Sequence, residues 1–203
     1  MNTLNVKKKM ASNIYVTPAA LTLVLTLSHG SVLAEGWSGN IGGMIGQVQL
    51  EDNDWGNQDD QGAIGLIADF RPASAPFSLA VDLIGSGDED DLSDRKNEIY
   101  SAAAHIGIRK VFDDSVSAFK PYVGAGIALI NAEMRSKDKQ TGLSRVEDDS
   151  ATGYWVGIGS YMELSDHFQV GLDLRYSEAD VTLFDSERQA GGLQTSVSVG
   201  YHW

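Results

Sequence analysis

Apolar and polar residues alternate with a period of two along most of this chain. The pattern is clearest at the C-terminus, where the apolar positions are Val197, Val199, Tyr201 and Trp203. Such alternation predicts a β-strand with one face in apolar surroundings and the other in polar or crowded surroundings. A strand that ends on an exposed Trp is unfavourable in water, whereas Trp is frequent at a membrane–water boundary. We therefore expect the apolar face to meet lipid.

Eight segments show the same alternation, and the connections between them differ in length. We predict strands at approximately Gly36–Leu50, Gly62–Phe70, Phe77–Ile84, Glu98–Phe112, Phe119–Ile130, Gly153–Leu164, Phe168–Ser177 and Leu193–Trp203. Three connections are short (Arg71–Pro76, Asp113–Ala118 and Ser165–His167), and four are long and acidic (Glu51–Gln61, Gly85–Asn97, Asn131–Thr152 and Glu178–Gly192). This layout predicts an all-β fold, an eight-stranded antiparallel up-and-down transmembrane β-barrel with short periplasmic turns and long extracellular loops.

Aromatic residues gather at the two ends of the predicted strands. The set beside the short connections and the chain ends comprises Trp37, Phe70, Phe77, Phe112, Phe119, Phe168 and Trp203, and a second set beside the long loops comprises Tyr100, Tyr154, Tyr176 and Phe184. Two such girdles are typical of the two interfaces of a bilayer. A soluble β-sandwich, the alternative, does not predict this sorting.

Charged residues within the strands fall on the face opposite to the apolar residues. We predict a charge network in the lumen that comprises Asp69, Asp82, His105, Arg109, Lys120, Glu163, Asp173 and Arg175, with His202 on the same face. Lys110 is the exception and lies near the short-turn rim, where a long side chain reaches the headgroups. A basic residue at the lipid midplane costs about 2–4 kcal/mol, which explains the separation.

The first strand is ambiguous. Trp37, Ile41 and Ile45 indicate one parity, whereas Met44 and the later Val48 and Leu50 indicate the other, so we expect a β-bulge between them.

An eight-stranded barrel is only wide enough to be filled by its own side chains. Because buried charges persist when they are paired, we expect a salt-bridged polar plug, with inward glycines making room for Tyr122, Trp155 and Tyr161. A narrow pore is the alternative, and it would need a continuous water path.

The N-terminus predicts a secretory signal peptide at residues 1–34, followed by the barrel domain at residues 35–203. Lys7, Lys8 and Lys9 precede an apolar run from Ile14 to Leu27, and a small residue, Ala34, ends the segment. A transmembrane anchor is the rival interpretation, but Pro18 interrupts the run and leaves it short for a span of about 20 residues.

Composition excludes several function classes. The formal net charge is −13, which is unfavourable for binding nucleic acid, and the chain has no cysteine, which excludes disulfides and thiolate metal sites. No phosphate-binding loop, dinucleotide fingerprint or zinc spacing is present.

A signal peptide, the segment from Lys120 to Ile127 (KPYVGAGI) and the terminal Tyr201-His202-Trp203 occur together. The chain thereby resembles the eight-stranded outer-membrane barrel superfamily of Gram-negative bacteria, which includes the OmpA transmembrane domain and the OmpX, OmpW and opacity-type proteins. The resemblance covers the whole mature chain and does not choose a subfamily. It implies location in the cell outer membrane, contact with outer-membrane lipids and lipopolysaccharide, and an assembly signal formed by Val197, Val199, Tyr201 and Trp203 for the barrel assembly machinery.

Two candidate chemistries remain to be weighed against structural roles. Lipid A-modifying barrels need a histidine, a serine and a carboxylate together, and His105, Ser101 and Asp82 are the one conceivable set here. The acidic runs at residues 51–60 and 88–91 could bind Ca²⁺ or Mg²⁺, although neither has EF-hand spacing and both suit a solvated surface.

We predict a non-enzymatic protein without cofactor or metal site, whose loops contact lipopolysaccharide, host surfaces or other cells in adhesion or envelope integrity. A channel for small or hydrophobic solutes is the second hypothesis, and a lipid A-modifying enzyme is the third.

Overall fold

The computed structural model describes residues 36–50, 60–91, 95–112, 117–183 and 186–203. The predicted signal peptide, most of the first acidic run (residues 51–59) and Phe184 lie outside these residues. Within the described ranges, no helix is long and apolar enough to cross a membrane.

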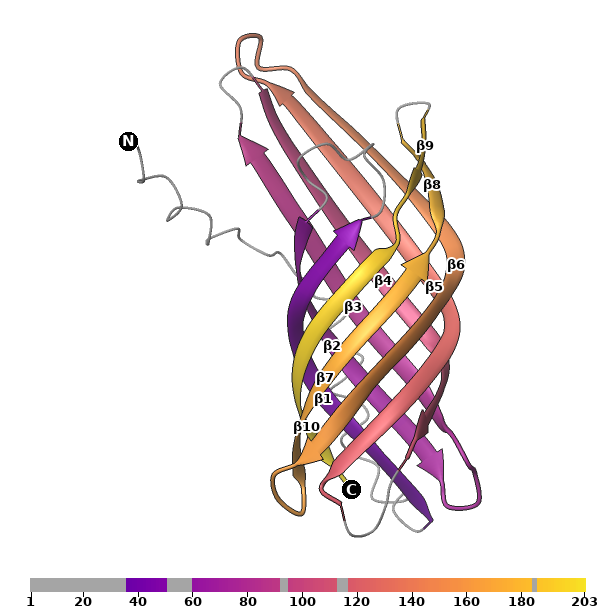
Figure 1. The fold of residues 1–203 in the computed structure, drawn as a ribbon. Coiled ribbons are helices and arrows are strands. Elements are labelled where there is room, and N and C mark those ends of the chain that lie inside the picture. Colours follow the sequence, from indigo (N-terminus) through magenta and orange to yellow (C-terminus); the bar gives the residue numbers. More distant parts are fainter. Residues whose placement is uncertain (1–35, 51–59, 92–94, 113–116, 184–185) are drawn as a thin grey trace, which may run out of the picture.

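Eight strands form one closed antiparallel barrel, in the order β1-β10-β7-β6-β5-β4-β3-β2 (Figure 1). Their bounds are β1 Trp37–Leu50, β2 Asp60–Pro72, β3 Ser78–Asp91, β4 Arg95–Val111, β5 Phe119–Asp138, β6 Ser144–Glu163, β7 Phe168–Glu178 and β10 Gly192–His202. Two short strands, β8 (Asp180–Leu183) and β9 (Ser186–Gln189), pair with each other in a separate hairpin between β7 and β10. The all-β, eight-stranded antiparallel barrel expected from the sequence is confirmed.

The two ends of the barrel differ. The C-terminus lies at the end that we call the lower rim, and the β5–β6 and β8–β9 hairpins project from the opposite end, the upper rim (Figure 1). At the upper rim, the pairing of β2 with β3 stops at Gly87, and that of β6 with β7 stops at Tyr154. The pairing of β3 to β6 with one another continues beyond these residues. We call this four-stranded extension the upper sheet (residues 88–91, 95–100, 131–138 and 144–153).

The apolar side chains face outward and many polar ones face inward. Ile45, Val199 and Leu172, for example, are 67%, 61% and 60% exposed, whereas Asp82 and Arg109 are 0% and 1% exposed. A contiguous apolar exterior around a polar interior is the reverse of a soluble protein, and it is stable when lipid surrounds the barrel.

The expected β-bulge in β1 is wrong. The register of β1 with β2 runs without interruption from Trp37, opposite Pro72, to Gln49, opposite Asp60. Both apolar sets are accommodated because they lie on opposite faces. Ile45 is exposed on the exterior, whereas Met44 is buried in an interior cluster that includes Tyr161.

Much of the length expected as loops is in fact strand. Residues 85–91 and 95–97 belong to β3 and β4, and residues 131–138 and 144–152 belong to β5 and β6. The hydrophobic alternation fades there because both faces are polar, and charged cross-strand pairs such as Lys96 with Glu89 (Nζ to Oε1, 3.1 Å) accompany the pairing instead. The last loop contains the β8–β9 hairpin, which the sequence analysis missed.

The β8–β9 hairpin contributes to an apolar cluster at the upper end of the lumen. Val181 and Leu183 are fully buried and belong to the same cluster as Ile99, Ile130 and Trp155. This cluster closes the upper end with side chains that do not attract water.

Candidate functional site

The centre of the lumen is built around Asp82, on β3. Arg109, on β4, donates through Nη2 to Asp82 Oδ2 at 2.8 Å, and Nη2 of Arg175, on β7, lies 2.7 Å from the same oxygen. All three side chains are at most 2% exposed. The Asp82 carboxylate therefore supplies a counter-charge that two buried guanidinium groups share.

Asp69, on β2, forms a second centre that is joined to the first through Arg109. Asp69 Oδ1 accepts a hydrogen bond from Arg109 Nη1 at 2.8 Å. Its other oxygen accepts from the Tyr161 hydroxyl at 2.9 Å and from the Asn40 side-chain amide at 2.8 Å. Arg109 Nη1 also donates to the Tyr161 hydroxyl at 2.9 Å. These contacts join β1, β2, β4 and β6 across the lumen.

Arg175 connects the network to His105 and Trp155. Its Nη1 lies 2.8 Å from His105 Nδ1, and its guanidinium carbon lies 4.7 Å from the centroid of the Trp155 ring. The His105 ring stacks on Trp155 at 5.9 Å between centroids. The Trp155 indole contacts the flat face of the Arg175 guanidinium, whose terminal nitrogens contact Asp82 and His105.

Asp173 completes the central network at its more accessible side. Tyr122 donates to Asp173 Oδ2 at 2.6 Å, and Arg175 Nε lies 3.3 Å from Asp173 Oδ1. Arg109 lies over the Tyr122 ring, 4.8 Å from its centroid.

Inward glycines leave the space that these rings occupy, as the sequence predicted. A Cβ built on Gly124 would lie 2.9 Å from the Trp155 ring, and one on Gly159 would lie 2.4 Å from the Tyr122 ring. Larger residues at these positions would displace the aromatic side chains.

The structure thus brings together Asp69, Asp82, His105, Arg109, Asp173 and Arg175. Lys120 and Glu163 form a separate, half-buried ion pair, with His202 Nδ1 at 3.8 Å from Glu163 Oε1. These two residues were predicted to belong to one network with the others, but no hydrogen bond or ion pair among the described residues connects them to it.

The arrangement of His105, Ser101 and Asp82 is not that of a catalytic triad. Asp82 receives the two arginines at one oxygen, and His105 Nδ1 contacts Arg175 rather than a carboxylate. The Ser101 hydroxyl lies 2.6 Å from the Ser86 hydroxyl. These contacts therefore hold each of the three residues in a packed interior rather than in a nucleophile–base pair.

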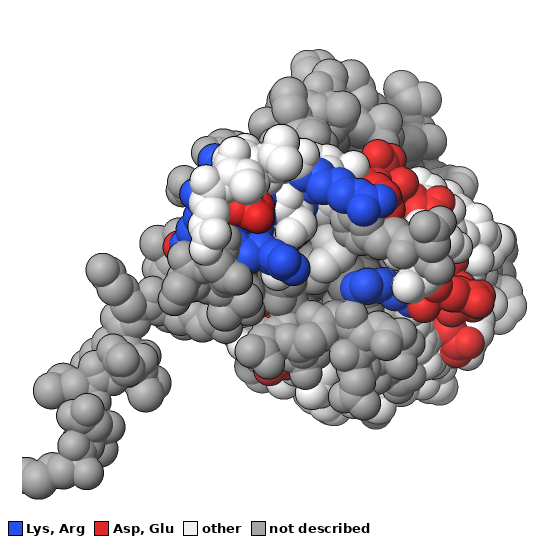
Figure 2. Space-filling view, turned by 90° about the horizontal axis from the view of Figure 1, so that it is seen from above, with Lys and Arg blue, Asp and Glu red and all other residues white. Residues whose placement is uncertain are grey.

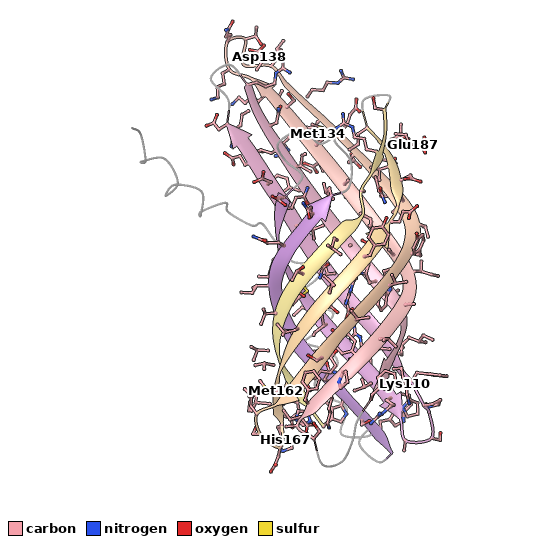
Figure 3. All side chains as sticks on the ribbon, viewed as in Figure 1. Lys110, Met134, Asp138, Met162, His167 and Glu187 are labelled. Atoms are coloured by element: carbon pink, nitrogen blue, oxygen red, sulfur yellow. The ribbon has the colours of Figure 1, made fainter. Side chains whose placement is uncertain are left out.

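The predicted aromatic girdle lies at the lower rim. Trp37, Phe77, Phe112, Phe119, Phe168 and Trp203 are 41–56% exposed, and Phe70 contacts Trp203 at 6.2 Å between ring centroids. Lys110 also lies near this rim, and His167 lies in its turn (Figure 3). The four residues proposed as the assembly signal, Val197, Val199, Tyr201 and Trp203, are all exposed on β10 or directly after it.

The acidic run at residues 88–91 lies on β3. Glu89 pairs with Lys96, and Asp91 pairs with Lys139. In the part of the chain that the structure describes, no group of three or more His, Asp or Glu residues is placed to hold a metal ion.

Sequence reasoning omitted some members of the network. Asn40 and Tyr161 donate to Asp69, Tyr161 also accepts from Arg109, and Tyr122 donates to Asp173. Their inward parity was visible in the sequence, but hydrogen bonds between strands far apart in the chain depend on barrel geometry.

Comparison with known proteins gives one family and a set of related folds. Residues 18–203 match the family model described as an outer membrane protein beta-barrel domain. Among solved structures, Neisserial surface protein A has a TM-score of 0.56 and 16% identity, covering 83% of this chain and 98% of its own. A major outer membrane protein from Thermus thermophilus has a TM-score of 0.59 and 8% identity, covering 83% and 100%.

A third structure is Ail, the attachment invasion locus protein of Yersinia pestis, in complex with the heparin analogue sucrose octasulfate. Its TM-score is 0.53 at 13% identity, covering 82% of this chain and 97% of its own. None of the curated proteins matches this chain by sequence. At these identities the likeness establishes the fold.

Proposed function

The chain belongs to the outer membrane β-barrel family, and from that membership and the filled lumen we propose a non-enzymatic protein that contacts surfaces outside the cell through its upper sheet. The family and the related folds place the barrel in the outer membrane. The proposal adds the role: the barrel is a rigid support, and the contact is adhesive or stabilises the envelope.

The observation that carries the proposal is the filled centre of the lumen. Arg109, Asp82 and Arg175 fill its centre at 2% exposure or less, and Val181 and Leu183 are fully buried at its upper end. A solute would have to displace both a paired charge network and an apolar cluster. Opening a path would separate buried charge pairs and leave charges without a partner in the lumen, which is strongly unfavourable, so we treat the plug as a support rather than a gate.

The remaining assignments follow from orientation in the membrane. We assign the lower aromatic girdle to the periplasmic interface and Tyr100, Tyr154 and Tyr176 to the outer interface, where the protein meets lipopolysaccharide. The signal peptide at residues 1–34 would deliver the chain to export, and the exposed face of β10 would be read by the assembly machinery. Ail is, by its name, a protein of attachment and invasion, and we extend attachment to this chain as part of the proposal.

Removing the tip of the upper sheet tests the surface-contact role. Because Met134 and Glu147 are cross-strand partners, residues 135–146 can be replaced by an Asn-Gly turn without changing the barrel register. Attachment of cells that carry this variant to host-cell or bacterial surfaces should fall to that of cells without the protein. Heat-modifiable migration on SDS gels should stay normal, which shows that the barrel assembles. Full attachment by the folded variant contradicts the proposal.

The two rival functions are tested on the intact protein. Planar bilayers should show no discrete conductance steps, whereas a channel would give them. The lipid A of cells that overproduce the protein should be unchanged in mass and identical to that of cells producing a His105→Ala variant. A mass change that depends on His105 would establish the enzyme in place of our proposal.

A further inference from the structure

Three arginines from three different strands gather at a cavity between the upper sheet and the β8–β9 hairpin. Arg95 on β4, Arg145 on β6 and Arg188 on β9 line a cavity of about 620 Å³. Its other lining residues are one acid, Asp138, and five uncharged residues: Asn97, Met134, Ser136, Leu143 and Ser144. Such a concentration of positive charge is unexpected in a chain of net charge −13.

Of the two acidic groups beside this cavity, one is held in a turn and the other pairs with one of the three arginines. Asp138 Oδ1 accepts hydrogen bonds from the backbone N–H groups of Gln140 at 2.8 Å and Thr141 at 2.9 Å, which fixes it in the β5–β6 turn. Glu147 Oε1 lies 2.9 Å from Arg145 Nη2. In the view from above, Lys and Arg side chains reach over the upper end from several sides, whereas most visible acidic side chains lie on one flank (Figure 2).

The cavity also has neutral walls that suit a sugar. The Ser136 hydroxyl donates to Asn97 Oδ1 at 2.9 Å, so two polar side chains are ordered against one another. Met134 lies between the two hairpins (Figure 3), and its sulfur is 4.0 Å from Arg188 Nη1. Leu143 adds a second apolar side chain, which is 73% exposed. Apolar side chains can cover the C–H faces of a pyranose ring, while hydroxyl and amide groups bind its hydroxyls.

We propose that this cavity binds a saccharide that carries sulfate or phosphate esters. A guanidinium presents paired N–H donors that match the oxygens of such esters, and three guanidiniums on separate strands can engage esters on successive sugar units. The inference rests on the proposed function and deepens it, since it names the chemistry that the upper sheet recognises.

The position of the cavity favours a ligand that approaches from the medium. Arg145 is nine residues above Tyr154 on β6, which at about 3.3 Å per residue and a tilt near 40° puts it about 20 Å above that tyrosine. The headgroup region of a bilayer is only about 5–8 Å thick on each side. Arg145 therefore lies above the headgroups of the membrane that holds the barrel.

Calorimetric titration of the whole detergent-solubilised protein tests the inference. The probes are a heparin-derived tetrasaccharide and a phosphorylated core oligosaccharide from lipopolysaccharide, each beside its desulfated or dephosphorylated counterpart. We expect at least one charged probe to bind, with its counterpart failing to bind and the affinity falling as salt is added. The probe that binds identifies the source of the ester.

A pair of variants separates the site from general charge. Arg95→Gln with Arg188→Gln should weaken binding about tenfold or more. Arg135→Gln is the matched control, because Arg135 lies on the opposite face of the same sheet and pairs with Glu133. It should change binding less than about twofold. Failure of both charged probes to bind, equal binding of the uncharged counterparts, or equal loss in the control variant overturns the inference. If attachment still depends on residues 135–146 in that case, the proposed function stands without this ligand.

Discussion

Arg109 and Arg175, on strands that are not neighbours in the barrel, converge on a single oxygen of Asp82. Their Nη2 atoms lie 2.8 and 2.7 Å from Asp82 Oδ2, and none of the three side chains is more than 2% exposed. The carboxylate between them offsets the repulsion of two like charges that lie this close, and Asp69 and Asp173 each pair with one of the two arginines. Asp82 is therefore the residue on which the interior of the barrel depends most.

Asp82→Ala should destabilise the folded barrel by about 3–5 kcal/mol, because it removes the carboxylate that two buried guanidiniums share and leaves each with one ion-pair partner fewer. Glu163→Ala is the matched control. It also removes a carboxylate from an ion pair, with Lys120, but the Glu163 side chain is 28% exposed, so the loss should be below about 1 kcal/mol. Urea titration in lipid vesicles, followed by the shift in gel mobility, measures both. Equal losses would show that the central network does not carry the stability assigned to it.

A second prediction concerns the space for Trp155. Gly124→Ala should cost about 1–3 kcal/mol, because its Cβ would lie 2.9 Å from the indole ring. Trp155→Phe in the same chain should recover part of that loss, so that the double variant is more stable than the sum of the single effects predicts. At Gly43 a Cβ would meet nothing within 4 Å, and Gly43→Ala should be nearly neutral. Additive effects at Gly124 and Trp155 would contradict the proposed contact.

The sequence was sufficient to predict what depends on one strand at a time. Side chains alternate between the two faces of a strand, and the apolar face meets lipid. This predicts that Leu172 lies on the outer face of β7 and that Asp173 and Arg175 lie on the inner face. It also predicts that glycines such as Gly159 face large inward rings, because a narrow lumen must alternate small and large residues.

What depends on the shear between strands could not be predicted. The contact of Tyr161 with Asp69 joins residues 92 positions apart, and no local pattern encodes it. In the upper sheet both faces are polar, so the alternation that identifies a strand is lost although pairing continues to Asp138. The β8–β9 hairpin left only the weak signal of Val181 and Leu183, two apolar residues with the same parity.

The side chains of the exterior should report lipid in a depth-dependent way. Nitroxide labels at Leu172 and Val197, which are 60% and 49% exposed on the barrel wall, should be relaxed by oxygen dissolved in the acyl chains and protected from a water-soluble nickel complex. Leu143 is equally apolar and 73% exposed, but it lies at the tip of the β5–β6 hairpin. A label there should show the opposite preference. Water accessibility at Leu172 would place the barrel wall outside the bilayer.

The β5–β6 turn should lose order in acid. Hydrogen bonds from the backbone N–H groups of Thr141 and Gln140 hold the pKa of Asp138 below its ordinary value. Because the pKa of Asp138 is lower in the folded than in the unfolded chain, its ionised carboxylate stabilises the turn at pH values above its unfolded pKa. This contribution is lost as the pH falls through the folded pKa of Asp138. Amide exchange at Thr141, measured by NMR, should therefore be slow at neutral pH relative to the intrinsic rate and lose this protection below about pH 4. Asp138→Asn should remove that pH dependence, and a protection profile that still follows pH in this variant would assign it to another group.

The β8–β9 hairpin should be held in place by its apolar side. Val181 is fully buried and packs in the cluster with Ile99 and Ile130, so Val181→Asp puts a carboxylate without a partner among apolar side chains. Burying an unpaired charge costs more free energy than the packing of a short hairpin contributes. The hairpin should therefore detach while the barrel below stays folded. Limited proteolysis should then cut within residues 180–189, with normal heat-modifiable migration of the uncut chain. Ser186→Asp introduces the same charge at an exposed position of β9 and should leave the hairpin resistant. If Val181→Asp stays equally resistant, the buried contacts of Val181 do not hold the hairpin.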